Sequence, residues 1–155
     1  MKVQDIMTPS PETCRETTNL AAAVEQLWRA DCGILPVTDT AGKLAGVITD
    51  RDICIALGTR NRPASDVTVA DVMRRTVETC GADEDVSEAL ARMKQRRVRR
   101  LPVVDREARI TGVLSLNDIV LAAGSGANAV KPSAVVETFK TICAHNVPVL
   151  VKGAA

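Results

Sequence analysis

The chain has 155 residues, of which 46% are apolar and 25% are charged, and its formal net charge is +1. This composition is typical of a globular protein and excludes a disordered or fibrous chain. No apolar run approaches the roughly 20 residues that a membrane span needs, and the N-terminal residues show no signal-peptide pattern. We therefore expect a cytoplasmic protein without membrane contact, folded as one compact domain or as two small intertwined halves.

Residues 3–58 recur as residues 69–124 without a gap, with 17 identities in 56 aligned positions. Each copy has an Asp-Ile-Met or Asp-Val-Met opening, a Leu-Pro-Val string, and a Gly-Val pair that precedes a hydroxyl residue and an aspartate. Two copies are too few for an open solenoid, and each copy alone would bury too little surface. We therefore expect the copies to pack together around a pseudo-two-fold axis, which leaves two equivalent clefts between them.

Each copy is predicted to fold in the order β-α-β-β-α. A short extended piece ends near Cys14 or Cys80, and Asn19 and Asp85 are plausible N-caps of the helix that follows. The next two strands are expected at residues 34–37 and 44–49 in the first copy, and at residues 100–104 and 110–115 in the second. The second helix of each copy should start and stop at equivalent residues, namely Asp50 and Gly58, or Leu116 and Gly124.

These patterns divide the chain into a first repeat at residues 1–62, a second repeat at residues 63–126 and a helical tail at residues 127–155. Residues 60–65 contain Pro63 and are predicted to form the linker. In the tail, apolar residues from Ser133 to about His145 fit one face of a helix. We expect this C-terminal helix to pack on the pair of repeats or on a neighbouring subunit.

Five cysteines occur, none of them in a C-x-x-C pair, and the chain has a single histidine. These counts argue against a zinc site or any other metal site. In a cytosolic chain the cysteines are expected to be reduced and mostly buried. Because Cys14 and Cys80 occupy equivalent positions in the two repeats, a disulfide between them remains an alternative.

A hydroxyl residue and an aspartate three positions later stand at the second predicted strand-to-helix junction of each copy: Thr49 and Asp52, then Ser115 and Asp118. The hydroxyl can cap the helix, and the aspartate complements the helix dipole. The same position also suits a ligand, because N–H groups at a helix N-terminus attract phosphate and a carboxylate can bind a ribose diol. Recurrence of the pair in both copies favours the ligand interpretation, and the capping interpretation stays open.

The Leu-Pro-Val strings place Pro36 and Pro102 inside predicted strands. A proline cannot donate to a sheet ladder, so it marks an edge strand or a place where the backbone faces a ligand. The residues just before differ, with Gly33-Ile34 in the first copy and Arg99-Arg100 in the second. Because arginine presents a forked array of donors, the second copy is expected to be better equipped for a polyphosphate.

The duplicated Asp-Ile-Met opening, Leu-Pro-Val strand and Gly-Val-Ile-Thr-Asp-Arg-Asp-Ile string resemble a tandem pair of CBS domains, also called a Bateman module. The resemblance covers residues 3 to about 124. It implies an α+β fold, in which two β-α-β-β-α units pack with pseudo-two-fold symmetry. It also implies two clefts that bind AMP, ADP, ATP or a related adenosyl ligand such as S-adenosylmethionine, with no separate cofactor.

Carried over residue by residue, the resemblance implies that Thr49 and Ser115 hold phosphate and that Asp52 and Asp118 hold ribose hydroxyls. The resemblance also implies an apolar wall around the base, formed by Ile34, Pro36 and Pro102. It places Arg100 near the phosphate. Arg51 stands inside the first motif where the second has Asn117. We therefore expect the two clefts to differ in affinity or in preference for mono- or triphosphates.

Catalysis needs a nucleophile or an acid–base pair, and the single histidine, His145, lies in the tail, remote from both motifs. We therefore expect a regulatory module that acts on an unidentified protein partner in trans, and not an enzyme. A nucleic-acid-binding protein is an alternative, because eight Lys or Arg residues stand between Arg92 and Arg109. The near-neutral charge and the scarcity of aromatic residues count against it.

A structural or redox-linked dimerisation protein without a nucleotide is a further alternative. Trp28 has Lys94 as its equivalent in the second repeat, so Trp28 does not suit the shared core. Closed two-fold dimers are the commonest oligomers, and the family resemblance also implies a dimer of modules. We therefore expect a homodimer with Trp28 in its interface.

Overall fold

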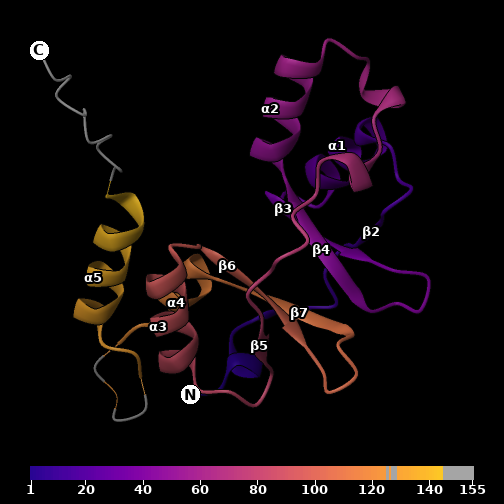
Figure 1. Ribbon diagram of the computed structural model, residues 1–155. Helices are drawn as coiled ribbons and strands as arrows, with labels where there is room; N and C mark the ends of the chain where they lie inside the picture. The colour runs from indigo at the N-terminus through magenta and orange to yellow at the C-terminus, as the bar shows by residue number, and fades with distance from the viewer. Residues whose placement is uncertain (125, 127–128, 145–155) are drawn as a thin grey trace, which may run out of the picture.

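The computed structural model describes residues 1–124, 126 and 129–144. It confirms the α+β class and the order predicted for each repeat (Figure 1). The first repeat consists of β2 (Cys14–Arg15), α1 (Leu20–Arg29), β3 (Ile34–Thr38), β4 (Leu44–Thr49) and α2 (Asp50–Arg60). The second consists of β5 (Cys80–Gly81), α3 (Val86–Arg96), β6 (Arg100–Val104), β7 (Ile110–Ser115) and α4 (Leu116–Ala122). A two-residue strand β1 (Thr8–Pro9) and a C-terminal helix α5 (Pro132–Cys143) complete the named strands and α-helices.

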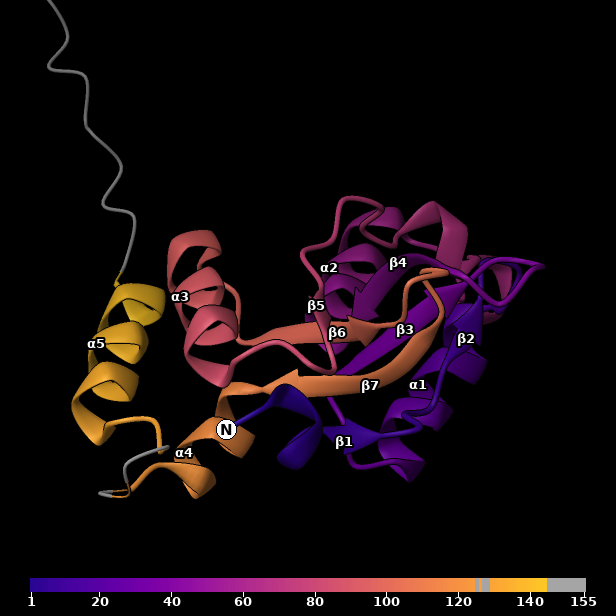
Figure 2. The ribbon, with the colours of Figure 1, turned by 90° about the horizontal axis from the view of Figure 1, so that it is seen from below.

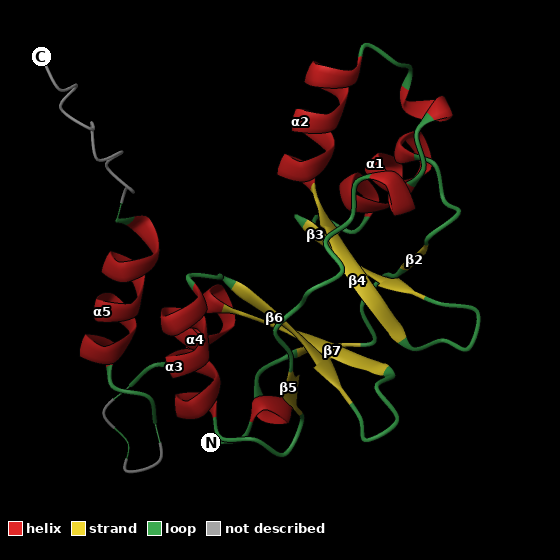
Figure 3. Ribbon diagram, in the orientation of Figure 1, coloured by secondary structure: helices red, strands yellow, loops and turns green. Residues whose placement is uncertain are grey.

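The strands form two sheets, one of order β2-β3-β4 and one of order β1-β7-β6-β5. Their central pairs have the same antiparallel register, with Pro36 opposite Val47 and Pro102 opposite Val113. Figure 3 shows the two sheets between two groups of helices, α1 and α2 on one side and α3, α4 and α5 on the other. Each sheet thus buries one face under the helices of its own repeat and turns the other toward its counterpart.

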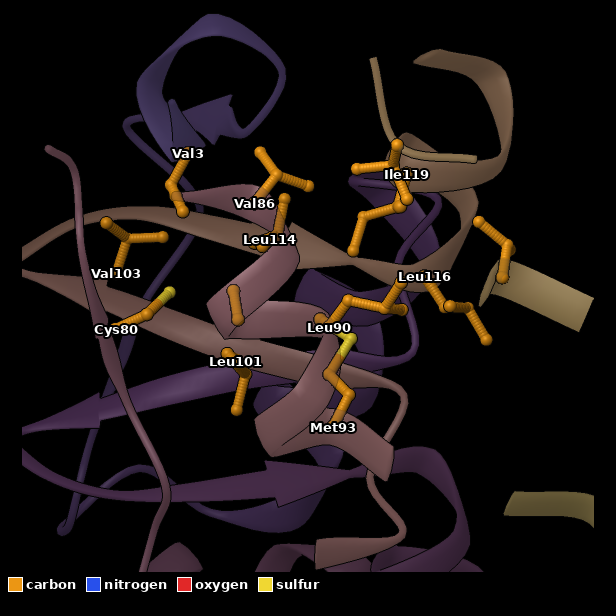
Figure 4. Close-up of a cluster of buried hydrophobic side chains, with 13 residues drawn as sticks. Val3, Cys80, Val86, Leu90, Met93, Leu101, Val103, Leu114, Leu116 and Ile119 are labelled. Atoms are coloured by element: carbon orange, nitrogen blue, oxygen red, sulfur yellow. The ribbon is translucent and has the colours of Figure 1, made fainter. Parts of the chain in front are cut away.

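The opening segment of each repeat packs into the core of the other repeat. Val3 lies in a 3-10 turn (Val3–Asp5), is 0% exposed, and joins the core of the second repeat (Figure 4). Its amide donates to the carbonyl of Glu84 at 3.0 Å. In return, Val69 in the turn Val69–Asp71 is 0% exposed in the core of the first repeat, and its amide donates to Thr18 at 2.8 Å. This exchange ties the repeats into one folding unit, because neither core is complete without the other repeat's opening segment.

The helix boundaries follow the sequence prediction with two exceptions. The Asn19 side chain accepts a hydrogen bond from the Ala22 amide, as expected for an N-cap. Asp85 stands at the N-cap of α3 but makes no capping bond, because its carboxylate pairs with Lys2 at 3.1 Å instead. Gly58 does not stop α2, which continues to Arg60 and ends at Asn61 with a φ of 49°. Asparagine tolerates this left-handed conformation better than most residues.

Helix α5 packs against α3 and α4 and covers the outer side of the second repeat (Figure 2). Its Val135 is 5% exposed and belongs to the core of that repeat. The structure thus confirms the C-terminal helix and its packing on the pair of repeats, and places its end at Cys143. His145 and the rest of the tail lie outside the described residues.

All five cysteines are free thiols, so the alternative of a disulfide between Cys14 and Cys80 is wrong. These two cysteines lie in the cores of different repeats. Burial raises the pKa of the Cys14 thiol to about 11 and that of Cys80 to about 12. The expectation that most cysteines are buried is also wrong, since two of the five are buried, Cys32 is half-buried, and Cys54 and Cys143 are exposed.

Candidate functional site

The junction of β4 and α2 holds Thr49 and Asp52 in a reciprocal capping arrangement. The Thr49 hydroxyl oxygen accepts a hydrogen bond from the Asp52 amide at 3.2 Å. The Oδ2 atom of Asp52 accepts bonds from the Thr49 amide at 3.2 Å and from the Thr49 hydroxyl at 2.6 Å. These bonds satisfy N–H groups that a helix start leaves without intrahelical partners.

The junction of β7 and α4 repeats this arrangement with Ser115 and Asp118. The Ser115 hydroxyl accepts from the Asp118 amide at 3.2 Å, and Asp118 Oδ2 accepts from the Ser115 amide and hydroxyl, each at 2.7 Å. The capping interpretation is therefore confirmed at both junctions. It does not conflict with a ligand interpretation, because each pair also stands beside a cleft.

The first cleft, here called the Ser115 cleft, has a volume of about 420 Å³. It lies between the second repeat's junction and the segment that joins α1 to β3. Ser115 and Asp118 line it together with Asn117, and Thr8 contributes from β1. Its charged side chains are Glu12, Asp31, Asp118, Arg99 and Arg100, which gives three carboxylates and two arginines.

The second cleft, here called the Thr49 cleft, also has a volume of about 420 Å³. Thr49 and Pro102 line it, and Val47 and Val98 add apolar surface. Its charged side chains are Arg51, Arg74, Arg96, Arg97, Arg99, Arg100, Asp50 and Glu78, which gives six arginines and two carboxylates. The Thr49 cleft is therefore far more basic than the Ser115 cleft.

Several predicted site residues meet at these clefts. Ile34 and Arg100 line both of them, because the clefts lie between the repeats and the starts of β3 and β6 are shared. Arg51 and Pro102 line the Thr49 cleft alone. Pro36 is different, since it is buried in β3 and lines neither cleft. Its side chain therefore does not join the predicted wall around a base.

The arginines are not divided between the clefts as their places in the two repeats suggest. Arg99 and Arg100 stand in the second repeat, and the sequence therefore suggested that this repeat binds a polyphosphate better. In the structure both residues reach both clefts, and most of the remaining positive charge surrounds Thr49 of the first repeat. The reason is topological, because each cleft is built from both copies and not from the copy that holds the motif.

Arg74 is the site residue that the sequence prediction missed. Its Nη2 and Nε atoms donate to Asp52 Oδ1 at 2.9 and 3.1 Å. Asp52 is therefore bound on both oxygens, and it does not line the Thr49 cleft, although its counterpart Asp118 lines the Ser115 cleft. Hydrogen bonds from Thr49 and Arg74 and the charge of Arg74 lower the pKa of Asp52, against the opposing and largest effect of burial. Comparison of position 74 with Thr8, its equivalent in the first copy, is the signal that could have found it.

Several basic residues of the segment from Arg92 to Arg109 are held in ion pairs or line the clefts. Arg92 pairs with Glu84 at 2.9 Å and Arg96 with Glu78 at 3.0 Å. Arg99 and Arg100 turn into the clefts instead. Charges that are paired or directed into clefts do not form the open stripe that a nucleic-acid backbone needs.

Both repeats match a known protein family. Residues 3–59 and residues 69–125 each match the family described as the CBS domain. The chain belongs to the CBS domain family. Both matches coincide with the two repeats, and they cover the two junctions and both clefts.

One longer protein and two solved structures are similar to this chain. The L-aspartate semialdehyde sulfurtransferase of Methanocaldococcus jannaschii is 32% identical over 117 residues, which are 76% of this chain but 22% of that protein. The CBS domain pair of protein MJ0100, in complex with 5′-methylthioadenosine and S-adenosyl-L-methionine, is 30% identical with a TM-score of 0.72, and covers 78% of this chain and 94% of that one. CBSX2 in complex with AMP is 26% identical with a TM-score of 0.68, and covers 78% and 94% of the two chains.

Two further observations concern the described residues. None of their helices is long and apolar enough to cross a membrane. No group of three or more His, Cys, Asp or Glu side chains among them is placed to hold a metal ion.

Proposed function

We propose that this chain is a sensor module that binds adenine nucleotides or related adenosyl compounds in its two clefts. The observation that carries the proposal is the pair of equivalent helix starts, each with a hydroxyl and a carboxylate, beside two clefts of about 420 Å³ that share arginines. Helix N-termini and arginines both bind phosphate. The adenosyl ligands of the related CBS pairs support the same ligand class.

In each cleft the hydroxyl residue, Thr49 or Ser115, is proposed to contact phosphate through its side chain and the adjacent amides. The carboxylate, Asp52 or Asp118, is proposed to accept hydrogen bonds from the ribose diol. Ile34 and Pro102 supply apolar surface for the base, and Arg100 is available to phosphates in either cleft. Arg51 adds a further positive charge to the Thr49 cleft only.

Isothermal titration with AMP, ADP, ATP and S-adenosylmethionine tests this function, with Ser115 and Asp118 as the first targets. Asp118→Ala removes one carboxylate that lines a cleft and should remove one ligand from the stoichiometry. Ser87→Ala, on α3 and outside both clefts, is the matched control and should bind like the wild type. A wild-type chain that binds none of these compounds would overturn the proposal, and a salt-sensitive complex with an oligonucleotide would favour the nucleic-acid alternative.

We further propose that the module is regulatory, not catalytic, and that it acts on a protein partner in trans. A ligand that touches both repeats can change their relative arrangement only if it binds one arrangement better than the other. Both clefts are lined by arginines, carboxylates and hydroxyls, and the Ser115 cleft also has Cys32 in its lining. Neither cleft has a histidine among its described lining residues. A cytoplasmic location agrees with the free thiols.

We also propose that a second copy of the chain covers the outer face of α1 and α2. Trp28 is 87% exposed there, and Val24, which lines the same surface hollow, is 43% exposed. In the second repeat, α5 packs against α3 near Lys94, the equivalent of Trp28, whereas the described residues place no such helix over Trp28. Trp28→Lys should lower the mass measured by light scattering toward that of one chain, while Lys94→Ala should not.

A further inference from the structure

The carboxylate of Asp52 is covered by an arginine, and that of Asp118 is not. Arg74 binds Asp52 Oδ1 through two nitrogen atoms, at 2.9 and 3.1 Å. The Asp52 side chain is 9% exposed, while the Arg74 side chain is 66% exposed. Among the described residues, Asp118 has bonds from Ser115 and no partner arginine.

The repeat itself provides the comparison that isolates Arg74. Arg74 exchanges backbone hydrogen bonds with Val47, at 2.9 and 3.0 Å. Its equivalent, Thr8, pairs in the same way with Val113 on β7. The backbone therefore approaches both junctions alike, and the side chain at this one position decides whether the carboxylate is occupied.

An occupied carboxylate puts any diol ligand in competition with Arg74. A ligand without additional phosphates must displace Arg74 from Asp52 without giving the guanidinium a new partner. Such a ligand therefore binds the Thr49 cleft more weakly. A ligand with additional phosphates can offer Arg74 a new partner, because guanidinium binds phosphate and carboxylate with the same forked geometry. The five other arginines of the Thr49 cleft favour the same ligand, since they make the cleft strongly positive.

We propose that Arg74 is a specificity-determining residue that makes the Thr49 cleft selective for nucleoside di- and triphosphates, by holding Asp52 until a polyphosphate takes the guanidinium over. This inference rests on the proposed nucleotide function and adds a division of labour between the clefts. The Ser115 cleft, with Thr8 in place of Arg74 and three carboxylates, accepts ligands that carry one phosphate or none.

The decisive experiment measures AMP and ATP binding by titration calorimetry in an Asp118→Ala background, which leaves the Thr49 cleft as the binding site. Arg74→Thr copies the residue at position 8. It should tighten AMP binding by about twofold, because AMP no longer has to displace a solvent-screened ion pair that contributes little free energy. It should weaken ATP binding by about as much, so that the ratio of ATP to AMP affinity falls.

Two further variants show whether the side chain acts as inferred. Arg74→Lys keeps the charge without the fork, and should weaken the hold on Asp52 while it retains most of the preference for ATP. Thr8→Arg, in an Asp52→Ala background, should weaken AMP binding at the Ser115 cleft. Thermal unfolding of each variant verifies that it is folded before its affinities are compared.

The outcomes separate this inference from the function on which it rests. If neither nucleotide binds the wild-type chain, the proposed function fails. If both nucleotides bind but Arg74→Thr leaves the ratio of ATP to AMP affinity unchanged, the role of Arg74 alone is overturned. If Arg74→Thr tightens both ligands equally, Arg74 only blocks the cleft, and the exchange with phosphate is wrong.

Discussion

The junctions at Thr49 and Ser115 have the same backbone and different neighbours. Their cap residues have φ, ψ values of −119°, 159° and −110°, 158°, and both hydroxyls bind the aspartate that follows three positions later. Position 74 holds an arginine over the first carboxylate, while the equivalent position 8 holds a threonine. The residues common to the two repeats determine the backbone and the helix caps at these junctions. The residues that differ between the repeats determine the electrostatics of each cleft.

The largest expected difference between the repeats comes from two equivalent glycines. A Cβ atom at Gly46 would lie 2.5 Å from the backbone carbonyl oxygen of Arg74, whereas one at Gly112 would lie 2.5 Å from the flexible side chain of Met7. Main chain paired across a sheet yields less readily than a methionine side chain. Gly46→Ala should lower the free energy of unfolding by about 3 kcal/mol and Gly112→Ala by about 1 kcal/mol, within the range for overpacking. Equal losses in urea titrations would show that both sites relax alike.

Much of the fold could be predicted because its signals are local and occur twice. The strands at residues 100–104 and 110–115 were predicted with the observed bounds, and both second helices begin where expected. The exchange of Val3 and Val69 between the cores was not predicted. It depends on contacts between residues far apart in the chain, which no pattern within one segment reveals.

The candidate site was predictable in its motif and not in its surroundings. Thr49, Ser115 and Asp118 line the clefts as the motif suggested. Pro36 does not, although its equivalent Pro102 has the same place in its strand and lines the Thr49 cleft. Arg74 was missed because it lies 22 residues after Asp52, and only the pairing of its segment with Val47 brings it back.

The exchanged opening segments provide a test in which the repeats should behave alike. Val3 and Val69 are both 0% exposed, and each fills the core of the other repeat. Val3→Ala and Val69→Ala should each cost about 2 kcal/mol, through lost burial and a cavity. Denaturation followed by circular dichroism should show a single transition in both variants. Two separate transitions would mean that the repeats unfold independently and that the exchange does not couple them.

The first helices of the repeats differ in their caps, with a smaller expected effect. Asn19 accepts a bond from the Ala22 amide at 2.9 Å, while Asp85 makes an exposed pair with Lys2 and caps nothing. Asn19→Ala should therefore cost about 1 kcal/mol, and Asp85→Ala only a few tenths of a kcal/mol. Thermal denaturation of the two variants measures the difference. A larger loss for Asp85→Ala would show that the ion pair with Lys2 holds the N-terminal segment in place.

A small effect is also expected for the dependence of stability on pH that Arg74 confers through Asp52. The pKa of Asp52 is lowered in the folded chain, so its contribution is present above the unfolded pKa of about 3.9 and is lost as the pH falls through the folded value. Because Arg74 is 66% exposed, solvent screens the pair, and Arg74→Thr should cost about 0.5 kcal/mol at pH 7.

That difference between wild type and Arg74→Thr should shrink as the pH falls below the unfolded pKa, and it should disappear only where Asp52 is protonated in the folded chain as well. Thr8→Ala is the matched control, because Thr8 occupies the equivalent backbone position without a carboxylate partner among the described residues. Its effect on the free energy of unfolding should be the same at pH 7 and pH 3. Urea titrations at the two pH values distinguish an arginine that stabilises Asp52 electrostatically from one that only packs over it, since packing alone would leave the loss independent of pH.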